Sequence, residues 1–397
     1  MSSILDRSAS EERRTHMDDD RPFADLPAAL VEDVLRETMA VADALLGDFR
    51  TMQQDRTRLR RDLEAAGMLM RESELPFPEF PTTCGLDGSY ALERLLATDL
   101  AAAAAVAVEG LTPPSEQRYW PQPRHVSFIA PEPHHAETAT VLRAVMLGCE
   151  LALASQAPHA LVLLDATLTL PIIYFNQAIS KASDLLDLEC AGRFHEDVLG
   201  YLSSYLEILR SERSDKQYVG LPKYSTRREV GRSAGWPTGQ DDRALLTFVL
   251  APGEFTTPIR LEWPEQPWHL GVTALPARLH QQAERLAAAI VAAIGEIHIC
   301  YYRPHPWLPA LRVEMAGTIP PNRHRLATVI YGLKSQCASP AMLEPYPLYL
   351  ADRTVKALAR AVPAFRHVAT QRVSERYDGD LGDVLFGLYG YRTESGR

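Results

Sequence analysis

The chain has 397 residues, of which 46% are hydrophobic and 23% charged, a composition typical of a soluble globular protein with one large domain or two moderate ones. Its net charge of −10 argues against a protein that holds nucleic acid by charge alone, although a local basic groove or a partner can still bring DNA to an acidic enzyme. Five cysteines without a CxxC pair, and a polar N-terminus, argue against a disulfide framework, a zinc ribbon and a signal peptide. We therefore expect a cytoplasmic protein. The longest apolar run, residues 100–108, is too short to span a bilayer, so no membrane association is expected.

The N-terminal part predicts a leader and a helical arm. Residues 1–24 are polar and charged, which is typical of a disordered segment. From residue 25 to 72, apolar residues recur at helical spacing, as at Leu30, Val34 and Val41. This arm is either a solvated helix or an element for docking or dimerisation.

Prolines between residues 76 and 81 end the arm, and an α/β domain is expected from residue 80 to 370. It opens with Cys84-Gly85-Leu86-Asp87-Gly88, in which two glycines let backbone, metal or phosphate approach Asp87. Residues 100–108 are rich in alanine, and propensity favours a helix there. They lack a polar face, however, which is also compatible with a strand buried on both sides.

Further elements follow in order along the chain. We expect strands at 125–130, 160–164, 217–223, 298–303 and 311–315, the last two as an antiparallel pair at the end of the sheet, and helices at 136–154, 171–180, 194–210, 279–294 and 351–361. Residues 326–333 are helical or extended, and residues 371–397 form a polar tail. The plan is a mixed sheet flanked by helices, an α/β class with antiparallel portions.

Three acids stand out against apolar surroundings. Asp87 and Asp165 interrupt apolar segments, and Glu150 lies within an apolar helix. A buried acid is costly unless it is paired or bound to a metal. Mg²⁺ and Mn²⁺ prefer such oxygen ligands, and a pair of ions can stabilise both the attacking and the leaving oxygen of a phosphodiester. Taken singly, each acid is better explained as a capping or turn aspartate or an exposed glutamate, and only together do they indicate a metal site.

The order of these segments resembles the NurA nuclease family, whose members work with the hexameric ATPase HerA. The resemblance covers about residues 80–365 and rests on G-L-D-G-S at 85–89, Glu150 before Asp165, L-V-L-L-D-A-T-L-T-L-P at 161–171, V-G-L-P-K at 219–223, R-V-E at 312–314 and P-Y-P-L-Y-L-A-D at 345–352. It implies an RNase H-like core in which Asp87 lies on the first strand and the alanine-rich segment is that strand's hairpin partner. No ATP site is visible, because Gly85-x-x-Gly88 lacks the lysine of a phosphate-binding loop.

The resemblance also implies an activity. Family members are manganese-dependent deoxyribonucleases that act as 5′ to 3′ exonucleases and single-strand endonucleases, form homodimers and dock on HerA. The implied setting is DNA end processing or phage defence. Carried over to this chain, two Mn²⁺ or Mg²⁺ ions would be held by four acids, namely Asp87, Glu150, Asp165 and Asp352.

Asp352 departs from the family pattern, because archaeal members have a histidine there. An aspartate also binds Mn²⁺ or Mg²⁺, so the change either shifts the site toward oxygen-only ligands or weakens the catalyst. Lys223 is implied as a catalytic residue that contacts the DNA phosphate, unless it is a surface lysine. Tyr346 either faces DNA or packs inside. The alternative function is a catalytically degenerate assembly subunit that docks on a HerA-like ring.

Overall fold

The computed structural model describes residues 26–111, 118–236 and 239–396. It divides the chain into two units, Met1–Arg58 and Leu59–Arg397. The expected leader, residues 1–24, lies outside the described residues. The expected arm is the helix α2 (Ala28–Ala65). The division falls before the expected boundary at residue 72, because Leu59 and Leu63 at the end of this helix are buried in the core of the second unit.

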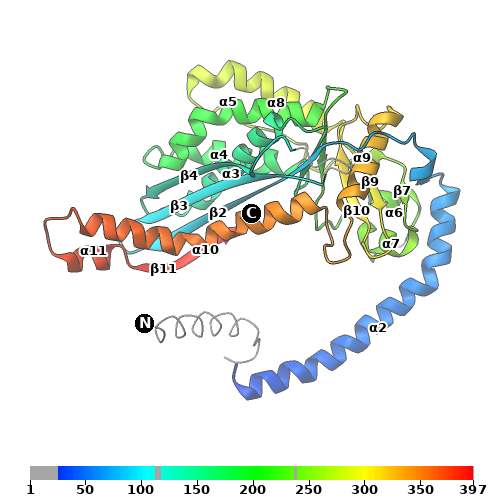
Figure 1. Ribbon diagram of the computed structural model, residues 1–397, viewed down its shortest axis with the longest axis horizontal. Coiled ribbons are helices and arrows are strands. Elements are labelled where there is room, and N and C mark those ends of the chain that lie inside the picture. Colours follow the sequence, from blue (N-terminus) through cyan, green and yellow to red (C-terminus); the bar gives the residue numbers. More distant parts are fainter. Residues whose placement is uncertain (1–25, 112–117, 237–238, 397) are drawn as a thin grey trace. The chain divides into compact units, whose positions relative to one another are not determined.

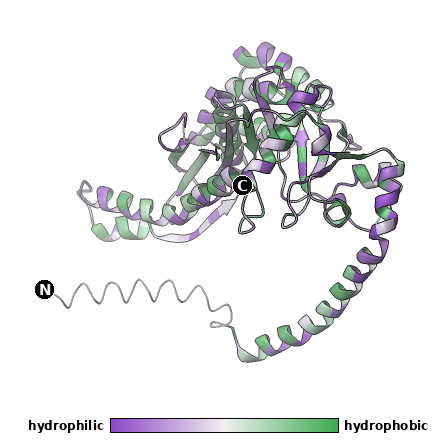
Figure 2. Ribbon diagram, turned by 45° about the vertical axis from the view of Figure 1, so that its right-hand side comes forward, coloured by the Kyte–Doolittle hydropathy of each residue, from purple (hydrophilic) through white to green (hydrophobic). Residues whose placement is uncertain are grey.

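The part of α2 in the first unit is amphipathic and exposes its apolar residues, and Figure 2 shows polar and apolar residues alternating along it. Eight apolar side chains are between 45% and 71% exposed: Leu30, Val34, Leu35, Met39, Val41, Leu45, Leu46 and Phe49. A surface helix normally buries its apolar stripe against a neighbouring element. We call these eight residues the arm face.

The second unit is built on one mixed sheet. Its strands are β1 (Leu69–Arg71), β2 (Thr83–Leu95), β3 (Asp99–Glu109), β4 (Arg124–Glu132), β5 (Leu161–Leu164), β6 (Gln217–Gly220), β7 (Glu254–Thr256), β8 (Ile259–Arg260), β9 (His298–Arg303), β10 (Leu311–Met315) and β11 (Gly390–Gly396). Within the described residues, the order is β1-β7-β9-β10-β6-β5-β2-β3-β4, with β11 on β2 and β8 on β9.

The centre of this sheet has the RNase H-like arrangement that the resemblance implied. Strands β2, β3 and β4 form an antiparallel meander. Strand β5 then pairs parallel to β2, and β6 pairs parallel to β5. The carboxyl ends of β5 and β6 therefore lie at one edge of the sheet, where open α/β sheets usually bind ligands.

Helices cover both faces of the sheet (Figure 1). They are α3 (Thr138–Gln156), α4 (Leu170–Ala182), α5 (Glu189–Arg210), α6 (Glu229–Ser233), α7 (Asp242–Val249), α8 (His280–Ile294), α9 (Arg323–Gln336), α10 (Tyr346–Ser374) and α11 (Leu381–Gly387), with 3-10 turns η1 (Glu72–Glu74) and η2 (Ala277–Leu279). One hydrophobic cluster joins β2, β3 and β5 to α3, α4, α5 and α8, and others join the opposite face to α9 and α10. Among the described helices, α3 alone is long and apolar enough to cross a membrane, and most of that apolar stretch is buried in the fold.

The alanine-rich segment is a strand, β3, as the resemblance implied and against its helix propensity. Ala101, Ala103, Ala105 and Ala107 lie in the cluster with α3, whereas Ala104, Val106 and Val108 lie in the cluster with α10. Both faces are thus covered by a helix. Small side chains allow both helices to approach, which is why the segment has no polar face.

Three expectations for the C-terminal half need correction. The pair β9 and β10 is antiparallel as expected, but it lies inside the sheet, because β7 and β1 continue beyond it. Helix α10 does not end at residue 361; it continues through Pro363, with Val362 buried against β2 and β3. The polar tail expected from residue 371 is structured through residue 396, because it contains the end of α10, then α11, then β11, which pairs with β2. The segment 326–333, left open between helix and strand, lies in α9.

Candidate metal centre

Three acids converge at the edge where β5 and β6 end. Asp87 lies on β2, Asp165 directly follows β5, and Asp352 lies in the second turn of α10. Because Leu86 on β2 pairs with Leu164 on β5, the two acids that follow them are neighbours. One carboxylate oxygen from each of the three residues lies within 4.8 Å of the others, and Asp87 and Asp165 are almost fully buried.

The glycines beside Asp87 allow this convergence. A Cβ at Gly85 would lie 2.6 Å from the backbone N of Leu348 and 2.7 Å from the backbone C of Pro347, so only glycine lets the first turn of α10 touch β2. A Cβ at Gly88 would lie 2.9 Å from Cγ of Met146 and 3.2 Å from Oε2 of Glu150 on α3. The expectation that these glycines permit a close approach is thus confirmed: the backbone of α10 approaches Gly85, and side chains of α3 approach Gly88.

Lys223 lies among these acids and is not a free surface lysine. Its Nζ is 2.7 Å from Asp165 Oδ2, 3.0 Å from Glu344 Oε2 and 3.5 Å from Asp352 Oδ1. Burial alone would lower the pKa of Lys223, but the charge and hydrogen bond of Asp165, followed by those of Glu344, outweigh burial and raise that pKa. The ammonium therefore stays charged and neutralises part of the acidic cluster.

Glu344 is a member of the cluster that the sequence did not single out. It lies in the loop just before α10, with only 20% of its side chain exposed. Burial raises the pKa of Glu344, although the ammonium of Lys223 opposes this effect. Its position immediately before the P-Y-P-L-Y-L-A-D motif was the available signal, and only the fold shows that it reaches Lys223.

Asp352 is held by two cations. Lys356 Nζ lies 2.7 Å from its Oδ1, in addition to the contact with Lys223. Burial would raise the pKa of Asp352, but these two ammonium groups outweigh burial and lower it. The carboxylate of Asp352 is therefore ionised and directed into the cluster.

The other two predicted site residues are placed less directly. Glu150 is 2% exposed on α3 and approaches β2 at Gly88, but it is not one of the three acids within 4.8 Å. Tyr346 is the half-buried first residue of α10. Its contact with DNA stays a prediction.

The donor set fits a hard divalent cation. The ligand atoms offered by Asp87, Asp165 and Asp352 are carboxylate oxygens, which Mg²⁺ and Mn²⁺ prefer. With Glu344 the cluster has four acids against two lysines, Lys223 and Lys356, so its negative charge exceeds the positive charge. Buried like charges are costly unless a cation compensates them. A bound divalent ion would supply that compensation.

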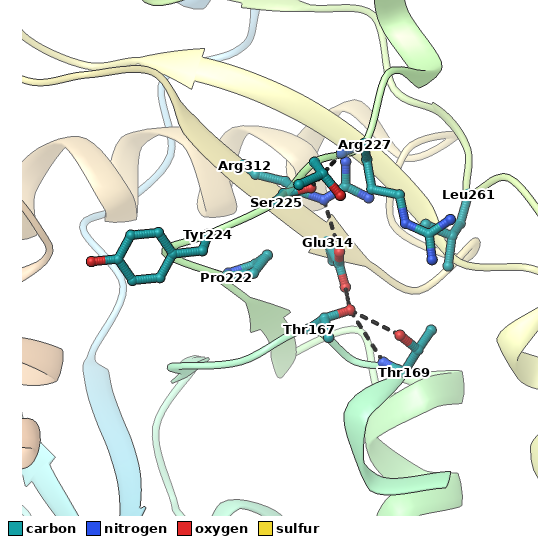
Figure 3. A pocket seen from close by; sticks show the side chains of 10 residues that line it. Thr167, Thr169, Pro222, Tyr224, Ser225, Arg227, Leu261, Arg312 and Glu314 are labelled. Carbon is teal, nitrogen blue, oxygen red and sulfur yellow. Dashed lines mark hydrogen bonds and ion pairs between the residues drawn. The ribbon is translucent and has the colours of Figure 1, made fainter. Parts of the chain in front are cut away.

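Beside these acids lies a buried ion network that includes the R-V-E segment. Arg312 donates from both terminal nitrogens to Glu229 at 3.0 Å, and from Nε to Glu314 at 2.9 Å. Glu314 in turn accepts hydrogen bonds from Thr167 Oγ1 at 2.7 Å and from the backbone N of Leu168 at 2.9 Å. The network thereby fixes the loop that follows Asp165, and Figure 3 shows Arg312, Glu314 and Thr167 in line.

Comparisons with known proteins agree with this architecture. No protein-family model and no curated protein matches the sequence. Among solved structures, the NurA nuclease from Sulfolobus solfataricus aligns over 87% of this chain and 98% of its own, with a TM-score of 0.53 and 11% identity. A second NurA structure aligns over 88% and 99%, with a TM-score of 0.52 and 14% identity, and NurA with manganese over 86% and 99%, with a TM-score of 0.50 and 13% identity. The likeness that the sequence motifs indicated is confirmed at the level of the fold.

Proposed function

We propose that this chain is a metal-dependent deoxyribonuclease that hydrolyses phosphodiester bonds with Mn²⁺ or Mg²⁺. The observation that carries the proposal is the convergence of Asp87, Asp165 and Asp352 within 4.8 Å at the ligand-binding edge of a NurA-like sheet. The likeness to NurA with manganese supports the choice of metal.

In this proposal, each residue has a defined role. Asp87, Asp165 and Asp352 hold the metal, and Glu150 completes the ligand set for a second ion. When bound, such ions supply a water nucleophile of lowered pKa and charge stabilisation at the phosphoryl oxygens. Lys223 pairs with the acids of the cluster. If a bound cation compensated these acids, the Lys223 ammonium would be available to the DNA phosphate as a point charge.

The polarity and substrate of the cleavage are proposed from the resemblance to NurA nucleases. We propose 5′ to 3′ exonuclease and single-strand endonuclease action in DNA end processing or phage defence, in the cytoplasm. We also propose a homodimer and a HerA-type hexameric ATPase as partners. The arm face supports a protein partner, because eight exposed apolar side chains on one helix are costly to leave in water.

The test is the cleavage of linear and circular DNA with Mn²⁺, with Mg²⁺ and with chelator. We expect metal-dependent loss of DNA with the wild type and none with Asp165→Asn, which removes a ligand charge without changing side-chain size. Asp187→Asn is the matched control, because Asp187 is an exposed residue just before α5. Equal cleavage by Asp165→Asn and wild type would overturn the site.

A second candidate function is a catalytically degenerate assembly subunit on a HerA-like ring. The position of Lys223 favours it, because an ammonium among the acids can replace a metal as their counter-charge. Thermal stabilisation by Mn²⁺ separates the two candidates, since only a protein that binds the ion is stabilised by it. A wild type without stabilisation, and without cleavage in the presence of the ATPase and ATP, would favour the assembly subunit.

A further inference from the structure

A cavity of about 310 Å³ adjoins the metal centre. Thr167 in its lining lies two residues after Asp165, and Pro222 and Tyr224 flank Lys223. Its volume is at the lower end of the range for small-molecule sites, which suits one nucleotide better than a large ligand. The same two loops therefore carry the metal centre and line the cavity.

The floor of the cavity is polar, and its charged side chains are hydrogen-bonded. Glu314 and Arg312 lie at its base, and Arg312 pairs with both Glu314 and Glu229 in the buried network described above. Thr167 Oγ1 and Thr169 Oγ1, 3.0 Å apart, add hydroxyl groups. The network has two carboxylates for one guanidinium, so the floor favours hydrogen-bond donors over anions. The side walls contributed by Pro222 and Leu261 are apolar.

Arg227 supplies a positive charge in the wall of the cavity. Its backbone is fixed, because its N donates to Ser225 Oγ at 3.2 Å and its carbonyl accepts from Asp242 N at 3.1 Å. Among the residues that the structure describes, however, no acid pairs with its half-buried guanidinium. The next residue, Arg228, instead uses its side chain structurally, donating to the carbonyls of Gln240 and Trp236. Arg227 is thus held in place with its charge available.

Tyr224 offers an aromatic face beside the cavity. It is 93% exposed, and Figure 3 shows its ring directed away from Glu314 and Thr167. An exposed ring next to a cation and a cavity is the combination that proteins use to hold single-stranded nucleic acid, since every base can stack on it.

We propose that this cavity is a subsite for one nucleotide of single-stranded DNA next to the cleaved phosphodiester. Its base enters between the apolar walls and places its donor groups on the polar floor. Its phosphate is bound by Arg227, and the neighbouring base stacks on Tyr224. This assignment rests on the proposed nuclease function for its substrate. A paired base cannot enter the cavity without leaving its duplex, so the subsite selects single strands and frayed ends.

The test measures binding rather than cleavage. A fluorescent oligothymidylate and a blunt duplex are titrated with the full chain in chelator, at several salt concentrations. We expect Tyr224→Ala to weaken oligothymidylate binding at least about fivefold, and Tyr224→Phe to retain it, because the ring is kept. We expect Arg227→Ala to weaken binding and to reduce the slope of log K against log salt by about 0.7, the value for one phosphate contact to a single strand. Arg285→Ala on α8, an exposed arginine outside the cavity, is the control.

The outcomes separate this subsite from the catalytic proposal. If Tyr224→Ala and Arg227→Ala bind oligothymidylate as tightly as the wild type and with the same salt dependence, the subsite is overturned, even if the wild type shows manganese-dependent cleavage. Reduced binding in these variants, together with a wild type that stays inactive with the ATPase and ATP, would support single-strand binding at the cavity and refute the nuclease. An equal loss of affinity for the blunt duplex would overturn the assignment to single strands.

Discussion

Replacing Gly85 by alanine should disable the metal centre without touching any of its acids. The added Cβ would lie 2.6 Å from Leu348 N and 2.7 Å from Pro347 C, both of them backbone atoms that cannot rotate away. The first turn of α10 must therefore retreat by about 0.8 Å to reach the 3.4 Å at which ordinary contacts begin. Because Asp352 follows on the same helix, its carboxylate retreats from Asp87 and Asp165 as well.

The size of the effect follows from this displacement. Overpacking of this kind costs about 1–3 kcal/mol of folding free energy, which leaves a domain of this size folded. A misplacement of about 1 Å at a reacting centre can reduce the rate about 100-fold. We therefore expect Gly85→Ala to melt a few degrees lower than the wild type, to cleave DNA about 100 times more slowly, and to gain less stability from Mn²⁺.

The assay pairs cleavage rates with melting temperatures, with and without Mn²⁺. Gly200→Ala is the matched control, because a Cβ at Gly200 on α5 meets nothing within 4 Å. Alanine should even stabilise this helix slightly, by about 0.5–1 kcal/mol. A folded Gly85→Ala protein that cleaves DNA and binds Mn²⁺ like the wild type would refute the argument that this glycine sets the position of Asp352.

Two further predictions concern charges. Lys223→Gln should lower the free energy of unfolding measured without metal. The loss should be smaller than the about 3–5 kcal/mol of a fully buried pair, because a third of the Lys223 side chain is exposed. The variant should also gain more stability from Mn²⁺, because no ammonium competes with the ion for the acids, and a smaller Mn²⁺ effect in melting curves would contradict this. Burial lowers the pKa of His159 below its usual 6.5, despite the 2.8 Å contact with Glu109. As the pH falls, the unfolded chain therefore binds a proton at this histidine before the folded chain does. The free energy of unfolding should consequently decrease as the pH drops below 6.5. Urea unfolding at pH 7.5 and 5.5 measures this loss, and His159→Gln should reduce it; an unchanged pH dependence in the variant would show that other groups cause it.

The sequence predicts the parts of the site that interrupt an apolar pattern. Asp87 and Asp165 each stand in or after a buried strand, where an acid needs a reason to be present. Glu344 was not predicted, because it lies in a loop among prolines, where an acid is common. Only its contact with Lys223 makes it part of the acidic cluster. No local pattern reveals a contact between residues so far apart along the chain.

The same contrast applies to the fold. Most helices and central strands follow from hydrophobic periodicity, but β3 required the family resemblance, because alanine alone favours a helix. Strand β11 was missed because Gly-Tyr-Arg-Thr-Glu-Ser-Gly has no apolar face; its residues are mostly exposed, and it is held by pairing with β2. The formation of such an edge strand depends on pairing with a strand elsewhere in the chain, here β2, so the local sequence does not predict it.

The long separation between β2 and its late partners has a consequence during protein synthesis. Asp87 leaves the ribosome long before Asp352 and β11, which follow it much later along the sequence. At about 5–20 residues per second, the interval lasts on the order of tens of seconds. Throughout that time the nascent polypeptide has the first acid but not the helix that completes the cluster. The three acids can therefore converge only after α10 has been synthesised, however early β2 folds.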